Sequence, residues 1–465
     1  MKGLVIMKKI VLILSSVFLC FALCACSAGD VNENDSEFSI SKIKKNYSKA
    51  HVLVLNGNSA TLDGTKLKEY DYTWNYDTSM KEPEYTGDEP DTSKCYIAHD
   101  IIYYPEIDSS LFVQENYDGE TEWVTHFTND ELKDYLFSTL PVLGNELPTD
   151  MMHSKEEAYN NPVIHITQPG DYIVEGNFNG QLFIDLGDKD ETFNDESKKI
   201  NLIFNGCDIN CSVAPSVVFY SLYECDNKWE DSENHPNEVD ISNAGAKVIL
   251  VDGTENNFTG TNVFRLLKPV YKKEGSTTQK KLFKTDGAFY SYVSLLIDGK
   301  TGIMNINAPT YEGLDSELHL TINGGYVNIV SNDDGINVNE DGVSVFTFND
   351  GRLTIFAGQG AEGDVVDSNG YINVNGGIIL GASPSVADNI LDSDCGTNIS
   401  ENATIIDNTS SIQGGMPGGP GGTPPEGMPG NIQAGQTPPE IPNGQGGPGG
   451  MPKGQGETPP EKPLN

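Results

Sequence analysis

The sequence predicts an all-β protein whose central half is a right-handed parallel β-helix, a solenoid of stacked β-coils. The first observation is a repeat, because Asn323, Asn349 and Asn375 each open a glycine-containing corner and are spaced by 26 residues. The second is that short stretches of alternating apolar and polar residues, typical of half-buried strands, flank each corner. The third is the lack of helix-forming stretches between the corners. Repeats of this kind bury their apolar face only by stacking on neighbours, and a β-propeller, the alternative, needs a longer period.

The N-terminal residues predict export. Lys8 and Lys9 precede an apolar run over residues 10–23, which is the order of a secretory signal peptide. The run ends in Leu23-Cys24-Ala25-Cys26, which resembles the bacterial lipobox. We therefore expect residues 1–25 to be a lipoprotein signal peptide, with Cys26 acylated and the protein held on the extracellular face of the bacterial cell membrane. An ordinary secretory peptide is the alternative.

Composition divides the rest of the chain into segments. Residues 26–47 are polar and read as a tether, and residues 413–465 are rich in Gly, Pro and Gln, which predicts a disordered tail. Between them we expect an N-terminal β cap with an insertion at 48–160 and the β-helix at 161–412. Two further insertions interrupt the β-helix, an acidic one at 223–246 and a basic one at 262–284.

The charge and the cysteines exclude several classes of protein. A formal net charge of −39, spread along the chain, repels nucleic acid and anionic lipid alike, so membrane contact is expected only through the anchor. A divalent cation can still connect an acidic protein to an acidic polymer. The five cysteines after Cys26 are too sparse to predict a disulfide framework. The sequence gives no oligomeric state.

Acidic residues recur at a second position of the repeat, about half a turn from the corners. There an inward apolar residue is followed by an outward Asp or Asn, as in Leu314-Asp315 and Ile336-Asn337. Because coils stack about 4.8 Å apart, such residues form a column of like charges that calcium, with oxygen ligands at about 2.3–2.6 Å, can bridge. The alternative is that Asp and Asn simply favour tight corners. The candidate ligands are Asp286, Glu312, Asp315, Asp333, Asp334, Asn337, Asp364, Asp367, Asp388, Asp392 and Asp394.

Several phrases resemble a family of bacterial carbohydrate-binding domain proteins. They include Gln168-Pro169-Gly170-Asp171, Val251-Asp252-Gly253-Thr254, Asp286-Gly287-Ala288-Phe289 and the Asn-Gly-Gly corners. The resemblance covers roughly residues 165–406. It implies a lipid-anchored or secreted parallel β-helix that binds calcium and adheres to acidic pectic polymers and cellulose. At Phe289-Tyr290 the outward acid is missing, which puts the edge of any metal column in doubt.

Catalysis is the competing hypothesis, since pectate lyases and polygalacturonases share this fold class. A lyase needs a cationic base near its calcium, yet the only Lys or Arg between residues 286 and 412 are Lys300 and Arg352, both near corners. Asp333 and Asp334 offer a carboxylate pair for a hydrolase, but no further polygalacturonase phrase follows them. We therefore assign no catalytic residue. A third hypothesis is a purely structural wall protein that uses its tail as a spacer.

Two stretches outside the column are candidate glycan contacts. Lys268, Lys272 and Lys273 of the basic insertion can pair with uronate carboxylates, but a solvated charged loop is the simpler explanation of them. Tyr72 and Trp74 belong to an alternating aromatic strand that either stacks on sugars or packs internally. The sequence thus predicts non-catalytic, calcium-dependent binding of acidic plant-cell-wall-type polysaccharide, with a lyase or hydrolase as the alternative.

Overall fold

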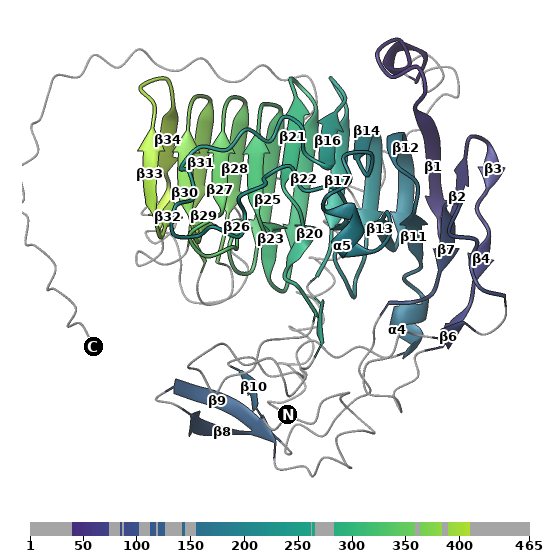
Figure 1. Cartoon of the computed structure of the whole chain (residues 1–465), viewed down its shortest axis with the longest axis horizontal. Helices are drawn as coiled ribbons and strands as arrows, with labels where there is room; N and C mark the ends of the chain where they lie inside the picture. The colour runs from purple at the N-terminus through teal and green to yellow at the C-terminus, as the bar shows by residue number, and fades with distance from the viewer. Residues whose placement is uncertain are drawn as a thin grey trace, which may run out of the picture.

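The computed structural model of the chain shows a row of parallel strands stacked side by side (Figure 1). It describes residues 40–73, 84–85, 88–101, 112–117, 120–125, 142–144, 155–261, 263–265, 283–358, 363–383 and 389–409. Each coil adds one strand to each of three parallel sheets, so a strand pairs with the strand three elements further on. For example, β22 pairs with β25 and β25 pairs with β28.

We call the three parallel sheets I, II and III. Sheet I contains the first half of β12 (Gly170–Asn179) and of β14 (Ile200–Asn210), then β16 (Ala246–Leu250), β21 (Leu295–Gly299), β24 (His319–Ile322), β27 (Val345–Phe348), β30 (Tyr371–Val374) and β33 (Gly396–Ile399). Sheet II contains the second half of β12 and of β14, then β17 (Glu255–Thr259), β22 (Ile303–Ala308), β25 (Tyr326–Ser331), β28 (Arg352–Phe356), β31 (Ile378–Ala382) and β34 (Thr404–Asp407). Sheet III contains β11 (Val163–Ile166), β13 (Gln181–Asp185), β15 (Val217–Ser221), β20 (Gly287–Ser291), β23 (Glu312–Ser316), β26 (Ile336–Val338), β29 (Val366–Ser368) and β32 (Asp392–Ser393).

The inward side chains stack in register and form one continuous core. In sheet I, Leu320 pairs with Phe346, and Phe346 pairs with Ile372, and all three are fully buried. Such a column of apolar side chains removes one face of every strand from water, which is the main stabilisation available to a coil. The alternation that predicted strands therefore also fixes which residues enter the core.

The predicted corners need glycine for two reasons. Gly325, Gly351 and Gly377 have φ values of 88°, 96° and 72°, a region that side-chain-bearing residues rarely adopt. A Cβ on Gly351 would also lie 2.4 Å from the backbone oxygen of Gly325 on the preceding coil. The 26-residue repeat is therefore the spacing of one coil.

The N-terminal end of the solenoid is covered by an irregular group of strands. β1 (His51–Gly57) pairs parallel with β12, and β2 (Ser59–Leu62) turns back antiparallel onto β1. Within residues 40–50, Ile43 and Ala50 pack against Ile173 and Ile203, so the described end of the predicted tether lies against sheet I. The same part of the chain contains β3 (Thr65–Lys66), β4 (Glu69–Tyr70), β5 (Tyr72–Thr73), β6 (Glu84–Tyr85), β7 (Tyr96–Ala98) and α4 (Lys155–Tyr159). β8 (Phe112–Tyr117), β9 (Glu120–Thr125) and β10 (Val142–Gly144) form a separate three-stranded antiparallel sheet.

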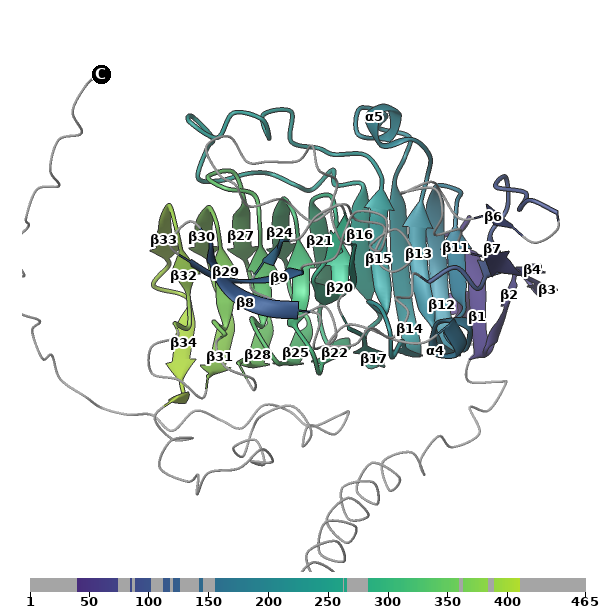
Figure 2. The ribbon, with the colours of Figure 1, turned by 90° about the horizontal axis from the view of Figure 1, so that it is seen from below.

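The remaining elements lie in loops of the solenoid. α5 (Lys189–Thr192) stands between β13 and β14, and β18 (Val263–Arg265) pairs antiparallel with β19 (Phe283–Thr285) at the base of the basic insertion. The acidic insertion, residues 223–245, connects β15 to β16. We call it the strap, because it extends along the solenoid from β15 toward β30 (Figure 2).

The predicted all-β class with long parallel sheets is confirmed, and the arrangement is consistent with a β-helix. Parallel pairing between successive coils does not fit the β-propeller alternative. The right-handed sense stays a prediction. Among the described cysteines, Cys207 and Cys211 are buried and free, so they pack in the core without a bridge. The part of the chain that the structure describes contains no helix long and apolar enough to cross a membrane.

Candidate metal-binding and glycan-binding site

Sheet III brings the predicted acidic residues into one column. Asp315 pairs with Asn337, Asn337 with Asp367, and Asp367 with Asp392, each in exact strand register on successive coils. The strands β23, β26, β29 and β32 position these side chains because each follows an inward apolar residue such as Leu314, Ile336 or Val366. We call these four residues the acidic column. The predicted geometry of a shared edge is thus present.

A second row of acids runs beside the column. Glu312, Asp334 and Asp364 each stand three residues before a member of the acidic column. Asp334 Oδ1 accepts the backbone N–H of Asp364 at 2.7 Å, and Asp364 Oδ1 in turn accepts the N–H of Asn389. The backbone N–H groups of each coil therefore aim the carboxylates of the coil before it.

Side chains also connect the two rows. Asn337 Nδ2 donates to Glu312 Oε1 at 2.8 Å, and Asn339 Nδ2 donates to Asp315 Oδ1 at 2.7 Å. Glu312 and Asp315 are almost completely buried. These amides hold the two carboxylates in fixed positions, so an ion would meet a site that is already arranged.

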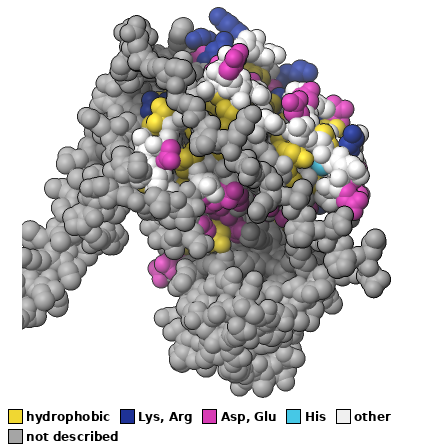
Figure 3. Space-filling view, turned by 90° about the vertical axis from the view of Figure 1, so that its left-hand side faces the viewer, with side chains coloured by type: hydrophobic (Ala, Val, Ile, Leu, Met, Phe, Trp, Pro, Cys, Tyr) yellow, Lys and Arg dark blue, Asp and Glu magenta, His cyan; other side chains and the backbone are white. Residues whose placement is uncertain are grey.

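Like charges in the two rows repel one another strongly. Burial, followed by the neighbouring carboxylate of Glu312, raises the pKa of Asp334 to about 9. Burial and then the charges of Asp364, Asp392 and Asp394 raise the pKa of Asp367 to about 6. Figure 3, which views the molecule from the end where β33 and β34 lie, shows Asp and Glu side chains among hydrophobic and other side chains at this end. A cation placed among these groups would relieve the repulsion and restore their charged forms.

The donor atoms fit a hard divalent cation. One ligand atom from each of Asp364, Asp367 and Asp392 lies within 4.8 Å of the others, a separation that one ion with oxygen ligands at about 2.3–2.6 Å can span. Asn337 Oδ1 is buried and has no hydrogen-bond partner among the described residues. An amide oxygen without a donor costs free energy in a protein interior, and it is a ligand type that calcium accepts. The residues present therefore fit calcium.

The column ends where the sequence departs from the pattern. Tyr290 pairs with Asp315 but is buried, and its hydroxyl donates to Glu317 Oε1 at 2.8 Å. Asp286 lies one coil before Glu312 and is fully buried. Asp333 and Asp394 lie beside the column, where their charges act on Asp334 and Asp367 respectively.

Other predicted site residues lie outside the described part of the chain. These are Asp388, Cys26, Trp74, Lys268, Lys272 and Lys273, and the side chain of Tyr72. Tyr70, from the same aromatic stretch, is buried and makes an edge-to-face contact with Tyr96, with ring centroids 5.6 Å apart. At this one position the aromatic residue packs internally. The glycan roles of the other residues stay predictions.

A second group with metal-ligand spacing, Asp226, His235 and His319, was not predicted from the sequence. Asp226 Oδ2 lies 2.7 Å from His235 Nε2 and 3.3 Å from His319 Nε2. The N–H of Val345 donates to His319 Nδ1, so the proton of a neutral His319 sits on Nε2 and points at Asp226. That protonation leaves His319 Nε2 without a lone pair for a metal. The group is therefore a hydrogen-bonded network.

This network fastens the strap to sheet I, because Asp226 and His235 belong to the strap and His319 belongs to β24. His235 Nδ1 lies 3.1 Å from the Pro236 oxygen, and its Nε2 lies 2.7 Å from Asp226 Oδ2, so the imidazole ring is held from both sides. Burial alone raises the pKa of Asp226, but hydrogen bonds from His319, His235 and the Lys228 N–H outweigh it and hold that pKa below its usual range.

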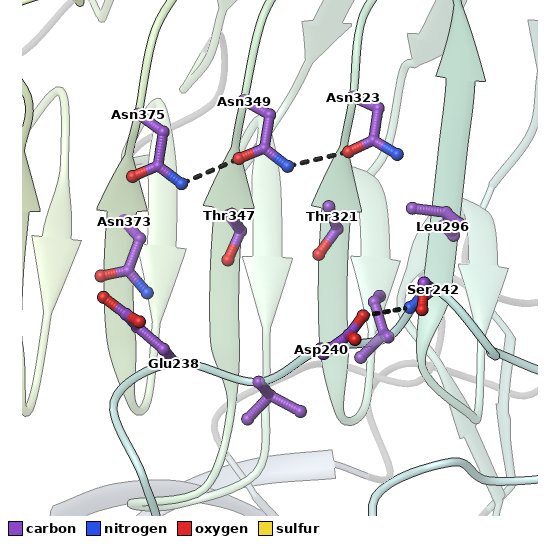
Figure 4. Close-up of a pocket in the computed structure, with 12 residues that line it drawn as sticks. Glu238, Asp240, Ser242, Leu296, Thr321, Asn323, Thr347, Asn349, Asn373 and Asn375 are labelled. Carbon is purple, nitrogen blue, oxygen red and sulfur yellow. Dashed lines mark hydrogen bonds between the residues drawn. The ribbon is translucent and has the colours of Figure 1, made fainter.

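A polar groove of about 420 Å³ runs between the strap and the outer face of sheet I (Figure 4). Its floor is a ladder in which Asn375 Nδ2 donates to Asn349 Oδ1 and Asn349 Nδ2 donates to Asn323 Oδ1, both at 2.8 Å. Glu238 and Asp240 of the strap line the opposite side. The predicted corner asparagines are therefore structural, since each joins its coil to the next.

Comparisons with known proteins found one family model and one solved structure. Residues 230–412, which contain the acidic column, match the model of a family described as carbohydrate-binding domain-containing protein. A solved structure titled "Structure of the polysaccharide lyase-like protein from C. thermocellum, Gadolinium derivative" is similar to the chain with a TM-score of 0.36 and 20% sequence identity, over 52% of this chain and 90% of that chain. No curated protein matches the chain.

Proposed function

We propose that the protein binds acidic polysaccharide of the plant-cell-wall type, polygalacturonate above all and cellulose as a further ligand, through calcium held on the acidic column, without cutting it. The observation that carries the proposal is the register of Asp315, Asn337, Asp367 and Asp392 on successive coils. The match to a carbohydrate-binding family over the same residues supports polysaccharide binding in general.

Each residue of the column has a defined task in this proposal. Asp364, Asp367 and Asp392 would hold the ion from one side, while Asn337 would contribute its buried amide oxygen. Calcium would supply positive charge for uronate carboxylates that the acidic surface otherwise repels. Of the four residues of the acidic column, Asp367 and Asp392 are accessible and would meet the polymer through the ion, whereas Asp315 and Asn337 are buried beneath the surface.

A lyase or hydrolase on the same scaffold is the alternative. Arg352 lies on β28 in sheet II, where its Nε donates to Thr354 Oγ1, and Lys300 follows β21 in sheet I. Both bases thus come from sheets other than the one that carries the acidic column. We therefore assign the column a binding role, and a lyase would be recognised by unsaturated products that absorb in the ultraviolet.

The location follows from the N-terminal sequence. We propose that Cys26 carries the lipid and holds the β-helix on the extracellular face of the bacterial cell membrane, with the chain from Cys26 onward leading to the folded part. Residues 413–465 would then extend from the opposite end of the solenoid, since β34 is the last described strand.

The test is retention on immobilised polygalacturonate in calcium and in chelator. We expect the wild type to be retained in calcium only, and the double variant Asp367→Asn/Asp392→Asn to lose at least about tenfold in affinity. Asp350→Asn is a matched control, because Asp350 is exposed at a corner away from the column. Equal retention of the wild type with and without calcium would contradict the proposal, and so would an unaffected double variant.

A further inference from the structure

A second pocket, of about 690 Å³, is lined in part by Tyr292, the residue that follows β20. It is enclosed by the segment around α5, by the strap, and by Tyr292, which stands two residues after the Tyr290 that ends the column. A pocket of this volume is large enough for a small ligand. None of its residues was predicted from the sequence as a binding site.

Aromatic rings form one part of the pocket. The Phe193 ring makes edge-to-face contacts with Trp229 and Tyr292, with centroids 5.8 Å and 5.9 Å apart. Trp229 and Tyr292 are half-buried, so part of each ring remains accessible from the pocket. Accessible ring faces next to polar side chains, here Asn194 and Asn227, suit the apolar face and the hydroxyls of a sugar ring.

A lysine stands among these rings, near the charges of Glu317 and Asp185 but in no close ion pair with a described residue. Lys189 Nζ lies 3.0 Å from the Tyr292 ring centroid and 3.8 Å from that of Tyr220, and it makes no ion pair or hydrogen bond among the described residues. Burial lowers the pKa of Lys189 to about 8, although Glu317 and Asp185 oppose the change. The ammonium is therefore incompletely solvated, and an anion bound beside it would compensate for that loss.

The buried carboxylates of the pocket do not serve Lys189. Glu224 accepts hydrogen bonds from the N–H and the hydroxyl of Ser294, both at 2.8 Å. Asp226 is engaged by His235 and His319. Both carboxylates therefore hydrogen-bond groups that hold the strap in place, and neither forms an ion pair with Lys189.

We propose that this pocket binds one uronate residue, whose carboxylate pairs with Lys189 and whose ring lies against Trp229. The identity of the sugar rests on the proposed function, which gives the protein an acidic polysaccharide as its ligand. The contact with Lys189 needs no metal ion. The pocket is thus a calcium-independent subsite beside a calcium-dependent one.

The experiment is a calorimetric titration of trigalacturonate into the full chain in the presence of chelator, which removes calcium from the acidic column. We expect measurable binding to the wild type, a loss of about tenfold or more in Lys189→Met and in Trp229→Ala, and retention in Lys189→Arg. Lys228→Met is the matched control, because Lys228 belongs to the same strap and its side chain is exposed. Melting temperatures report whether each variant is folded.

Two results would overturn the subsite. One is unchanged binding in folded Lys189→Met, and the other is equally tight binding of neutral trigalactose by the wild type. Retention of polygalacturonate by Lys189→Met in calcium is measured in parallel. If polygalacturonate is retained in calcium but trigalacturonate does not bind in chelator, the proposed subsite is wrong and the proposed function stands. If trigalacturonate binds in chelator but polygalacturonate retention does not depend on calcium, the calcium site on the column is wrong and the subsite stands.

Discussion

At the scale of single residues, the site is governed by carboxylates that are harder to ionise in the folded chain than in water. Asp367 is the clearest case, because burial and three neighbouring acids raise its pKa to about 6. An ordinary Asp titrates near about 3.9 in an unfolded chain. Folding without a cation therefore favours the protonated form of Asp367, so the folded protein binds this proton more tightly than the unfolded one.

The sign of the resulting pH dependence follows. A raised carboxyl pKa contributes stability that is complete below about pH 4 and is lost as the pH rises through about 6. In chelator, we expect wild type to lose up to about 2 kcal/mol across this window relative to Asp367→Asn, whose amide does not titrate. Melting curves of both proteins between pH 4 and pH 7 measure the difference, which calcium should abolish for the wild type at pH 7.

Asp334 extends the same effect to higher pH, since its pKa is raised to about 9. The stability of the chelated protein should continue to fall above pH 7, whereas Asp367→Asn alone should not prevent this second decline. If the stability of the wild type and that of Asp367→Asn change in parallel from pH 4 to pH 7, the neighbouring carboxylates do not raise the pKa of Asp367.

At the scale of elements, the strap is the feature that periodicity does not describe. It has no repeat of its own, and its path is fixed by contacts with distant parts of the chain. His235 meets His319 across the Asp226 carboxylate, and the backbone oxygen of Asn237 accepts a hydrogen bond from Asn373 Nδ2 at 2.7 Å. The strap therefore depends on a few polar anchors, while the coils beneath it depend on a continuous apolar core.

Removing the Asp226 carboxylate should detach the strap from sheet I without unfolding the coils of the solenoid. Asp226→Ala leaves two buried imidazoles without their shared acceptor, which we expect to cost about 3 kcal/mol. Hydrogen exchange should then accelerate in residues 226–242, while exchange in β24 and β27 changes little. Glu233→Ala, an exposed substitution in the same strap, is the control. Equal exchange in Asp226→Ala and the control would mean that other contacts hold the strap.

The sequence predicted the coils better than it predicted the loops, for a physical reason. Stacked coils repeat the same environment, so the asparagine spacing and the acid after each inward apolar residue reveal the register of Asp315, Asn337, Asp367 and Asp392 directly. The Lys189 pocket combines α5, the strap and Tyr292, which are far apart in the chain and share no pattern. For the network of Asp226, His235 and His319, the available signal was the single histidine, His235, within the acidic insertion.

At the scale of the whole molecule, the residues proposed for attachment and those proposed for recognition lie in different parts of the chain. The described acidic column lies in the last coils, β23 to β32, whereas the proposed lipid is at Cys26, before the N-terminal cap. The coils from β12 to β20 stand between the N-terminal cap and the column. Attachment and polymer binding should therefore be separable by mutation.

Substitution of the anchor tests this separation. Cys26→Ser cannot form the thioether, so we expect the protein to leave the membrane fraction almost completely and to accumulate in the medium. The released protein should still bind polygalacturonate in calcium as the anchored one does. Fractionation followed by immunoblotting measures the first effect, and retention on the polymer measures the second. A Cys26→Ser protein that stays with the membrane would exclude this cysteine as the point of attachment.

The pairing of every strand with its equivalent on the next coil has an evolutionary consequence. Since neighbouring coils meet through the same backbone hydrogen bonds and the same inward side chains, an in-frame duplication of one coil can be inserted without redesigning its neighbours. Each duplication would lengthen the charged edge by one residue and increase the number of monosaccharides held at once. Genetic copying, rather than invention of new folds, would then suffice to adapt such a protein to longer or shorter stretches of polymer.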